Sequence, residues 1–162
     1  MPRNQAYSER LAMESKCTTW PQACTPVSVR PAAAVVRAVA AFDPDLAVLG
    51  LPGSALLHYA SDAGLRAVGE AFADRAYAAD GTLVPRSVPG SVIHDPDTVS
   101  ARVIELATQG TVMSVDGQRL TVSAESVCVH GDTPGAVDIA RAVRRGLENA
   151  GVRVGPFVQS AA

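Results

Sequence analysis

The sequence predicts an α/β fold built from parallel β/α units, and three observations support this prediction. Short apolar runs alternate with amphipathic segments of helical periodicity. The apolar runs lack strict polar–apolar alternation, so we expect strands that are covered on both faces. Charged or small polar residues follow each run, where parallel α/β folds gather their ligands. Both an open α/β sheet and a segment of a β/α barrel fit this pattern.

Residues 1–30 differ from the rest of the chain. They have no sustained apolar period and several prolines interrupt them, so we predict a poorly ordered leader. A globular unit is predicted from residue 31 to residue 157, followed by a tail of residues 158–162. Its first element is a predicted alanine-rich helix that begins at Pro31 and ends at Phe42.

Two strand–helix units are expected next. Leu46–Leu51 is predicted to be a buried strand, and residues 52–64 a helix that opens at Pro52, Gly53 and Ser54. Residues 65–72 are predicted to form a second strand, after which the chain enters a long loop.

The second half of the chain continues the alternation of helices and strands. Residues 95–110 predict a helix, and residues 111–122 predict a hairpin around Asp116 and Gly117. The buried face of this helix is predicted to contain Val99, Val103 and Leu106.

The last strand–helix unit is expected between residues 125 and 151. Residues 125–131 predict a third buried strand, and the following helix is predicted to have Asp132 or Thr133 as its N-cap. Its predicted apolar face consists of Val137, Ala140, Val143 and Leu147. Residues 152–154 predict the start of one more strand.

Composition excludes several classes of function. The chain has 162 residues, of which 48% are hydrophobic and 19% charged, and a formal net charge of -2, which suits a single globular domain. Without a basic excess we expect no nucleic-acid or membrane partner, and without a signal-peptide pattern we expect a cytoplasmic protein. The three cysteines are too few for a disulfide framework, and the Cys17–Cys24 spacing does not predict a metal site.

Polar residues occur at three predicted strand ends, which makes this edge of the sheet the candidate site. Gly53 and Ser54 follow the first strand, but no second glycine or lysine completes a phosphate loop, so a helix cap is the better interpretation. Residues 70–86 follow the second strand and are rich in acids and arginines. Residues 130–132 follow the third.

Glu70 lies within the apolar second strand, where an unpaired carboxylate would be costly. We therefore expect it to have a cationic or hydrogen-bonding partner, with Arg75 and Arg86 as the near candidates. In a functional interpretation, an arginine binds a substrate carboxylate while Glu70 or Asp74 transfers protons. In a structural interpretation, the same charges form an ion-pair network that holds the loop.

His130 emerges from the third strand beside a helix N-terminus, where a histidine can act as acid or base. Asp132 could orient it, or the two residues could serve only as a helix cap and a hydrogen-bonded rim residue. Cys128, within the strand, is expected to be a small buried hydrophobe rather than a nucleophile.

Three stretches closely resemble the C-terminal half of the LamB/YcsF family, which comprises the A subunits of 5-oxoprolinase. They are AVAAFDPDLAVLGLPGSALL, EAFADRAYAADGTLVPRSVPGSVIHDP and VCVHGDTPGAVDIARAVRRGL. The resemblance implies a partial β/α barrel of the glycoside hydrolase/deacetylase type. It also implies ATP-dependent opening of a small lactam, 5-oxoproline, to L-glutamate together with 5-oxoprolinase subunits B and C.

The residues that match the family motifs divide by expected role. The resemblance implies proton transfer by Glu70, Asp74 and His130, and substrate binding by Arg75, Arg86 and Asp132.

The family motifs D-L-N-x-D-x-G-E and K-P-H-G-x-L-Y-N are absent from this sequence. We therefore expect a truncated family member that is inactive alone. The alternative is a non-enzymatic binding or assembly remnant of the same complex.

Overall fold

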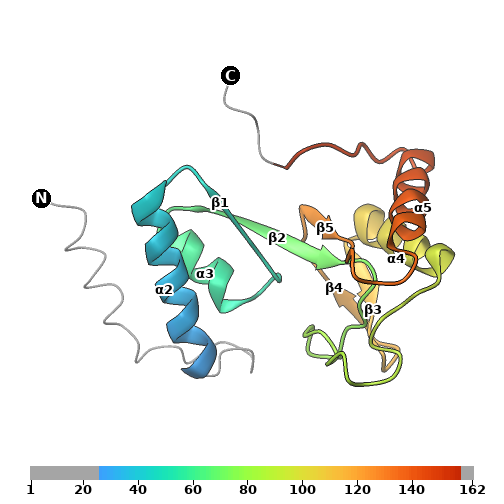
Figure 1. Ribbon diagram of the computed structural model, residues 1–162, viewed down its shortest axis with the longest axis horizontal. Coiled ribbons are helices and arrows are strands. Elements are labelled where there is room, and N and C mark those ends of the chain that lie inside the picture. Colours follow the sequence, from blue (N-terminus) through green and yellow to red (C-terminus); the bar gives the residue numbers. More distant parts are fainter. Residues whose placement is uncertain (1–25, 158–162) are drawn as a thin grey trace, which may run out of the picture. The chain divides into compact units, whose positions relative to one another are not determined.

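The computed structural model describes residues 26–157, which form two compact units with their boundary between Ala67 and Val68 (Figure 1). The predictions for residues 1–25 and 158–162 lie outside the described residues.

The first unit contains helix α2 (Pro26–Phe42), strand β1 (Ala47–Gly50) and helix α3 (Ala55–Asp62). Helix α2 begins at Pro26, so the predicted start at Pro31 is wrong. Pro31 lies inside the helix, where its ring removes one backbone hydrogen bond without ending the helix.

Helix α3 begins as its sequence predicts. The Ser54 hydroxyl accepts a hydrogen bond from the Leu57 N–H at 3.4 Å, which satisfies one free donor of the first turn. The core of this unit is a small apolar cluster that consists of Val36, Val48, Ala60 and Leu65.

Strand β2 (Arg66–Phe72) crosses the boundary and leads into the second unit. The remaining elements there are α4 (Pro96–Gln109), β3 (Thr111–Met113), β4 (Arg119–Thr121), β5 (Ser126–Cys128) and α5 (Ala136–Asn149). Strands β2 and β5 are parallel, and β3 and β4 form the predicted antiparallel hairpin. The second unit is therefore an α/β arrangement with parallel strands.

The two faces of the β2–β5 pair differ in character. Ala73, Val127 and Val129 pack against the apolar faces of α4 and α5, which lie beside each other (Figure 1). This core includes Val99, Val103, Ile139, Val143 and Leu147. Because side chains alternate along a strand, Glu70, Phe72, Ser126 and Cys128 lie on the opposite face. The strands thus present a polar face away from the helices.

The start of α5 differs from the prediction. The helix begins at Ala136, after Gly135 in the left-handed conformation (φ 80°), and has no side-chain cap. The predicted N-caps Asp132 and Thr133 are therefore wrong. Both side chains bind residues of the 73–94 loop instead, so tertiary contacts override the local capping signal.

The buried face of α5 agrees only in part with the prediction. Val143 and Leu147 are buried as expected, whereas Val137 is 62% exposed and Ala140 is exposed. Ile139 and Ala142 take the inner positions, because the apolar stripe follows the 3.6-residue period from Ile139 onward. The predicted strand at residues 152–154 does not form.

Within residues 26–157, no helix has the length and apolar character needed to cross a membrane.

Candidate functional site at the ends of β2 and β5

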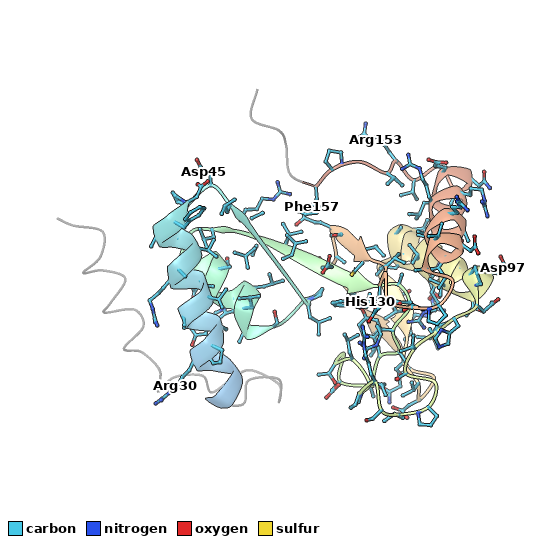
Figure 2. All side chains as sticks on the ribbon, viewed as in Figure 1. Arg30, Asp45, Asp97, His130, Arg153 and Phe157 are labelled. Carbon is cyan, nitrogen blue, oxygen red and sulfur yellow. The ribbon has the colours of Figure 1, made fainter. Side chains whose placement is uncertain are left out.

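The register of the two parallel strands brings Asp74 and His130 together. Phe72 is the partner of Cys128, and the Ala73 N–H continues the ladder by donating to the Cys128 carbonyl at 2.9 Å. Asp74 and His130 each lie two residues beyond this pair, so both lie on the polar side at the carboxyl end of the sheet. Figure 2 shows His130 just beyond the end of β5.

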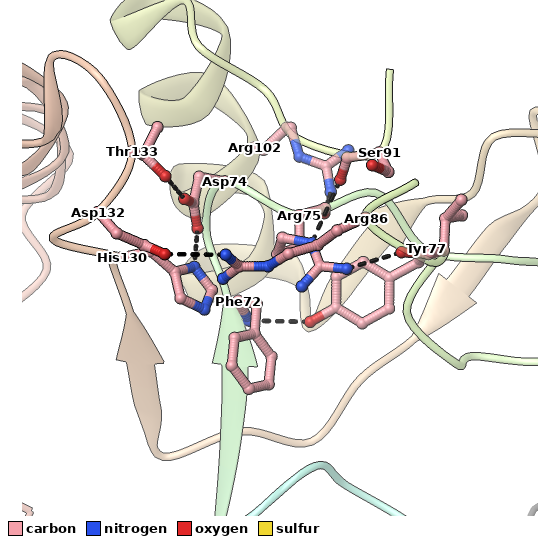
Figure 3. A network of polar contacts seen from close by, with 11 residues as sticks. Phe72, Asp74, Arg75, Tyr77, Arg86, Ser91, Arg102, His130, Asp132 and Thr133 are labelled. Carbon is pink, nitrogen blue, oxygen red and sulfur yellow. Dashed lines mark hydrogen bonds and ion pairs between the residues drawn. The ribbon is translucent and has the colours of Figure 1, made fainter. Parts of the chain in front are cut away.

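Asp74 is completely buried and both of its carboxylate oxygens have partners (Figure 3). Oδ1 lies 2.7 Å from Nδ1 of His130, and Oδ2 accepts a hydrogen bond from the Thr133 hydroxyl at 2.9 Å. A buried carboxylate is tolerated only when such partners replace water. Asp74 is therefore held in place by Thr133 and is also in contact with the imidazole of His130.

The imidazole of His130 is held on a second side by an aromatic ring. It stacks on Phe72 with a centroid separation of 5.5 Å and an interplanar angle of 13°. The Phe72 N–H in turn donates to the hydroxyl of Tyr77 at 2.9 Å. Tyr77 is buried, and burial raises the pKa of its phenol above the ordinary value. The stack on Phe72 and the contact with Asp74 together fix the ring of His130.

Arg75 supports the loop that carries Asp74. Its guanidinium is buried and donates to the carbonyls of Ser91 at 3.3 Å and Val84 at 2.6 Å. The Arg75 carbonyl accepts a hydrogen bond from Arg102 at 3.0 Å, and burial lowers the pKa of Arg102. The guanidinium of Arg75 thus joins distant parts of the loop by binding their backbone carbonyls.

Arg86 and Asp132 form an ion pair at the exposed rim of the site. Nη1 of Arg86 lies 2.9 Å from Oδ2 of Asp132, and the side chains are 49% and 67% exposed. The hydrogen bond and positive charge of Arg86 lower the pKa of Asp132. This pair connects the loop after β2 with the loop after β5.

Glu70 has a hydrogen-bonding partner, as its place in the strand predicts, but neither of the two candidate arginines is that partner. Its Oε1 accepts a hydrogen bond from the Ser126 hydroxyl at 3.4 Å, across the strand register. Arg75 is occupied by backbone carbonyls and Arg86 by Asp132. Glu70 is only half-buried on the polar face, which reduces the cost of an unpaired charge.

The strand-end pattern locates the site but misses several of its members. Asp74, His130, Arg86 and Asp132 come together as the strand-end argument suggests. Thr133 is predicted only as a helix cap, and nothing in the spacing marks Phe72 or Tyr77 as a support for His130. The missed signal is the position of Thr133 directly after a polar strand end, where its hydroxyl can face the neighbouring strand.

Other chemistry has less support among the described residues. Cys128 is half-buried, and burial raises the pKa of its thiol, which disfavours the thiolate. No cluster of three or more His, Cys, Asp or Glu side chains is placed to hold a metal ion within residues 26–157.

The fold and site define an α/β protein with a strand-end aspartate–histidine pair, and comparison with known proteins gives its family. The sequence profile of the LamB/YcsF family matches residues 26–162. The chain therefore belongs to the LamB/YcsF family.

Similar proteins carry a consistent name. The chain is 58% identical over 126 residues to the A subunit of the 5-oxoprolinase from Streptomyces griseus, and the match covers 78% of this chain and 50% of that protein. It is 53% identical over 128 residues to the corresponding A subunit from Paracidovorax citrulli, covering 79% and 51%. The crystal structure of a lactam utilization protein from Thermus thermophilus matches with a TM-score of 0.73 and 46% identity, covering 78% of this chain and 50% of that one. The chain thus spans about half the length of these relatives.

Proposed function

We propose that this chain is the C-terminal half of a β/α barrel of the glycoside hydrolase/deacetylase type that hydrolyses 5-oxoproline to L-glutamate with ATP. It acts in the cytoplasm, together with two partner subunits, B and C. The names of the relatives and the parallel β2–β5 pair support this proposal. The single observation that carries it is the buried Asp74–His130 pair at the carboxyl ends of these strands.

The proposed reaction consumes one ATP and two water molecules. The lactam oxygen attacks the γ-phosphorus of ATP, and ADP leaves. One water then attacks the activated ring carbon, the C–N bond breaks, and the nitrogen takes a proton to give an acyl phosphate. A second water releases phosphate and L-glutamate.

His130 transfers the protons of the ring-opening step, since it is the partly accessible member of the pair, with 18% of its side chain exposed. Arg86 is the exposed guanidinium at the rim, and it binds the carboxylate of 5-oxoproline or a phosphate in exchange for Asp132. Arg75 supports the loop in this proposal, because its donors already bind carbonyls. Glu70 lies on the same polar face, two residues before Phe72, and faces the substrate side.

A complementation assay tests this function. The chain is mixed with the portion of the Streptomyces griseus relative that it does not cover and with partner subunits B and C. ATP-dependent release of glutamate from 5-oxoproline is then measured. We expect release from the complete mixture and none from the chain alone, because strand-end sites need several strands.

Variants of two histidines make the assay specific. His130→Ala is expected to lower the rate by a factor of about 10² or more, as for loss of a general acid or base. His94→Ala, an exposed histidine of the same unit, is the matched control and should retain the rate. A complex that assembles but never releases glutamate would instead favour the non-enzymatic assembly remnant.

A further inference from the structure

Asp74 is placed to act through His130 rather than on a substrate. Its side chain is 0% exposed, and each carboxylate oxygen already has a hydrogen-bond partner. No part of this carboxylate is open to a ligand. Its chemical influence must therefore pass through the imidazole that it contacts.

The contact with Asp74 decides which nitrogen of His130 carries the proton in the neutral ring. A carboxylate oxygen only accepts hydrogen bonds, so Nδ1 at 2.7 Å is the donor. The proton is then on Nδ1, and Nε2 has the free lone pair. Within residues 26–157, Nε2 has no hydrogen-bond partner.

Thr133 fixes the carboxylate in the orientation that this contact needs. Its hydroxyl is buried and donates to Oδ2 at 2.9 Å, so Oδ1 remains directed at the imidazole (Figure 3). The stack on Phe72 limits rotation of the ring that would exchange its two nitrogens. These contacts of Asp74, Thr133 and Phe72 together favour one tautomer.

We propose that Asp74 and Thr133 are positioning residues that hold neutral His130 with its proton on Nδ1, so that Nε2 is the atom that exchanges protons with the substrate. The role of Nε2 toward a substrate rests on the proposed function. The tautomer itself does not, because it is a property of the chain alone.

The tautomer can be measured directly by ¹⁵N NMR of the histidine-labelled chain at a pH where the imidazoles are neutral. We expect a pyrrole-type Nδ1 and a pyridine-type Nε2 for His130 in the unmodified chain. The opposite assignment would overturn the proposal. This measurement needs no variant and no activity.

Two substitutions at Thr133 then test the positioning role. Thr133→Val keeps the shape and removes the hydroxyl, so we expect a measurable population of the other tautomer. Thr133→Ser keeps the hydroxyl and should restore the single tautomer. An unchanged tautomer in Thr133→Val would remove Thr133 from the proposal.

A matched control is present in the same unit. The hydroxyl of Thr98 also donates to a carboxylate, that of Asp95, but at the start of α4. Thr98→Val should therefore leave the spectrum of His130 unchanged. If Thr98→Val shifted the tautomer of His130 as much as Thr133→Val does, the shift would reflect a general loss of packing in the unit, which would contradict the proposal.

Activity in the complementation assay gives a separate readout. Thr133→Val should lower kcat about tenfold with little effect on KM, since Thr133 acts on His130 through Asp74 and does not contact the bound substrate. If the NMR result holds and no preparation releases glutamate, the proposed function fails while the tautomer assignment stands.

Discussion

The charges of Arg86 and Asp132 are screened by water more strongly than those of Asp74 and Arg75. The rim pair is exposed on both sides, whereas Asp74 and Arg75 are buried and bind fixed partners. Exposed pairs contribute little to folding because water and salt weaken them. The rim pair is therefore better suited to exchange partners with a ligand than to stabilise the fold.

Arg86→Ala should raise the pKa of Asp132 toward that of an ordinary aspartate. Because Arg86 lowers the folded-state pKa, its contribution to stability is present above the unfolded value of about 3.9 and is lost as the pH falls through the lowered folded value. A ¹³C NMR titration of the side-chain carboxyl measures the change. Asp95 is the internal control, since its lowered pKa comes from hydrogen bonds of Thr98. An Asp132 titration that does not move would contradict this assignment.

Tyr77→Phe should destabilise the chain by about 1 kcal/mol near neutral pH, because the Phe72 N–H loses its acceptor. The difference should shrink in alkali. The folded-state pKa of Tyr77 is raised, so the unmodified chain loses stability as the pH rises above the unfolded value of about 10, and the variant lacks this group. Urea unfolding at neutral and alkaline pH measures both effects. A constant difference would show that burial of the phenol is not what couples stability to pH.

Among the elements, α4 and α5 pack tightly against each other at Gly146. A Cβ added there would overlap the hydroxyl of Ser100 and lie 3.0 Å from Cδ1 of Ile104. The Ser100 hydroxyl cannot turn away freely, because it donates to the Ala142 carbonyl at 3.1 Å. The glycine is thus required by helix packing rather than by backbone conformation.

Gly146→Ala should therefore destabilise the chain by about 1–3 kcal/mol, the usual cost of overpacking, although alanine favours a helix by about 1 kcal/mol. Urea unfolding measures the loss. In a double-mutant cycle, Ser100→Ala should recover part of it by removing the overlapping atom. Strictly additive effects would mean that the two residues do not meet.

Most elements of the fold can be predicted from the sequence, and the errors have a common physical cause. Strands and helices with a strong apolar period are located correctly, as for β2 and α4. The start of α5 is misplaced because Thr133 and Asp132, which look like caps, bind side chains about fifty residues away along the chain. Local sequence does not contain information about such distant partners.

The candidate site shows the same limit. Strand-end placement predicts that Asp74 and His130 lie at the same edge of the sheet, since both follow strands of one parallel pair. It does not predict their contact: Asp132 is the residue that the sequence suggests for orienting His130, but Asp132 binds Arg86 and Asp74 takes that place. Charge spacing suggests that Glu70 binds an arginine, but Arg75 binds loop carbonyls. Which donor satisfies which acceptor depends on the path of the 73–94 loop, and spacing alone does not determine that path.

On the scale of the whole molecule, the chain spans about half the length of its relatives and exposes several large apolar side chains. These include Val35, Phe42, Leu46, Val88, Val115 and Val137. Such side chains are often covered by a further part of a protein or by a partner.

Adding the portion of the Streptomyces griseus relative that this chain does not match should raise the unfolding temperature of this chain. Binding to the folded state alone stabilises by about 2.7 kcal/mol when the free partner is at 100 times its Kd. Scanning calorimetry over a series of partner concentrations measures the shift, with serum albumin at equal concentration as the control. An unfolding temperature independent of partner concentration would contradict complementation.

Because Phe72 pairs with Cys128, the contact between Asp74 and His130 forms only when strands β2 and β5 are in the correct register. A slip of one residue would turn the side chains of one strand to the other face, so Asp74 would lose its imidazole partner and His130 its carboxylate. A misregistered chain would bury an unsatisfied charge, and His130 would lose the contact on which its proposed proton transfer depends. A chain that retains the contact has therefore also aligned these two strands.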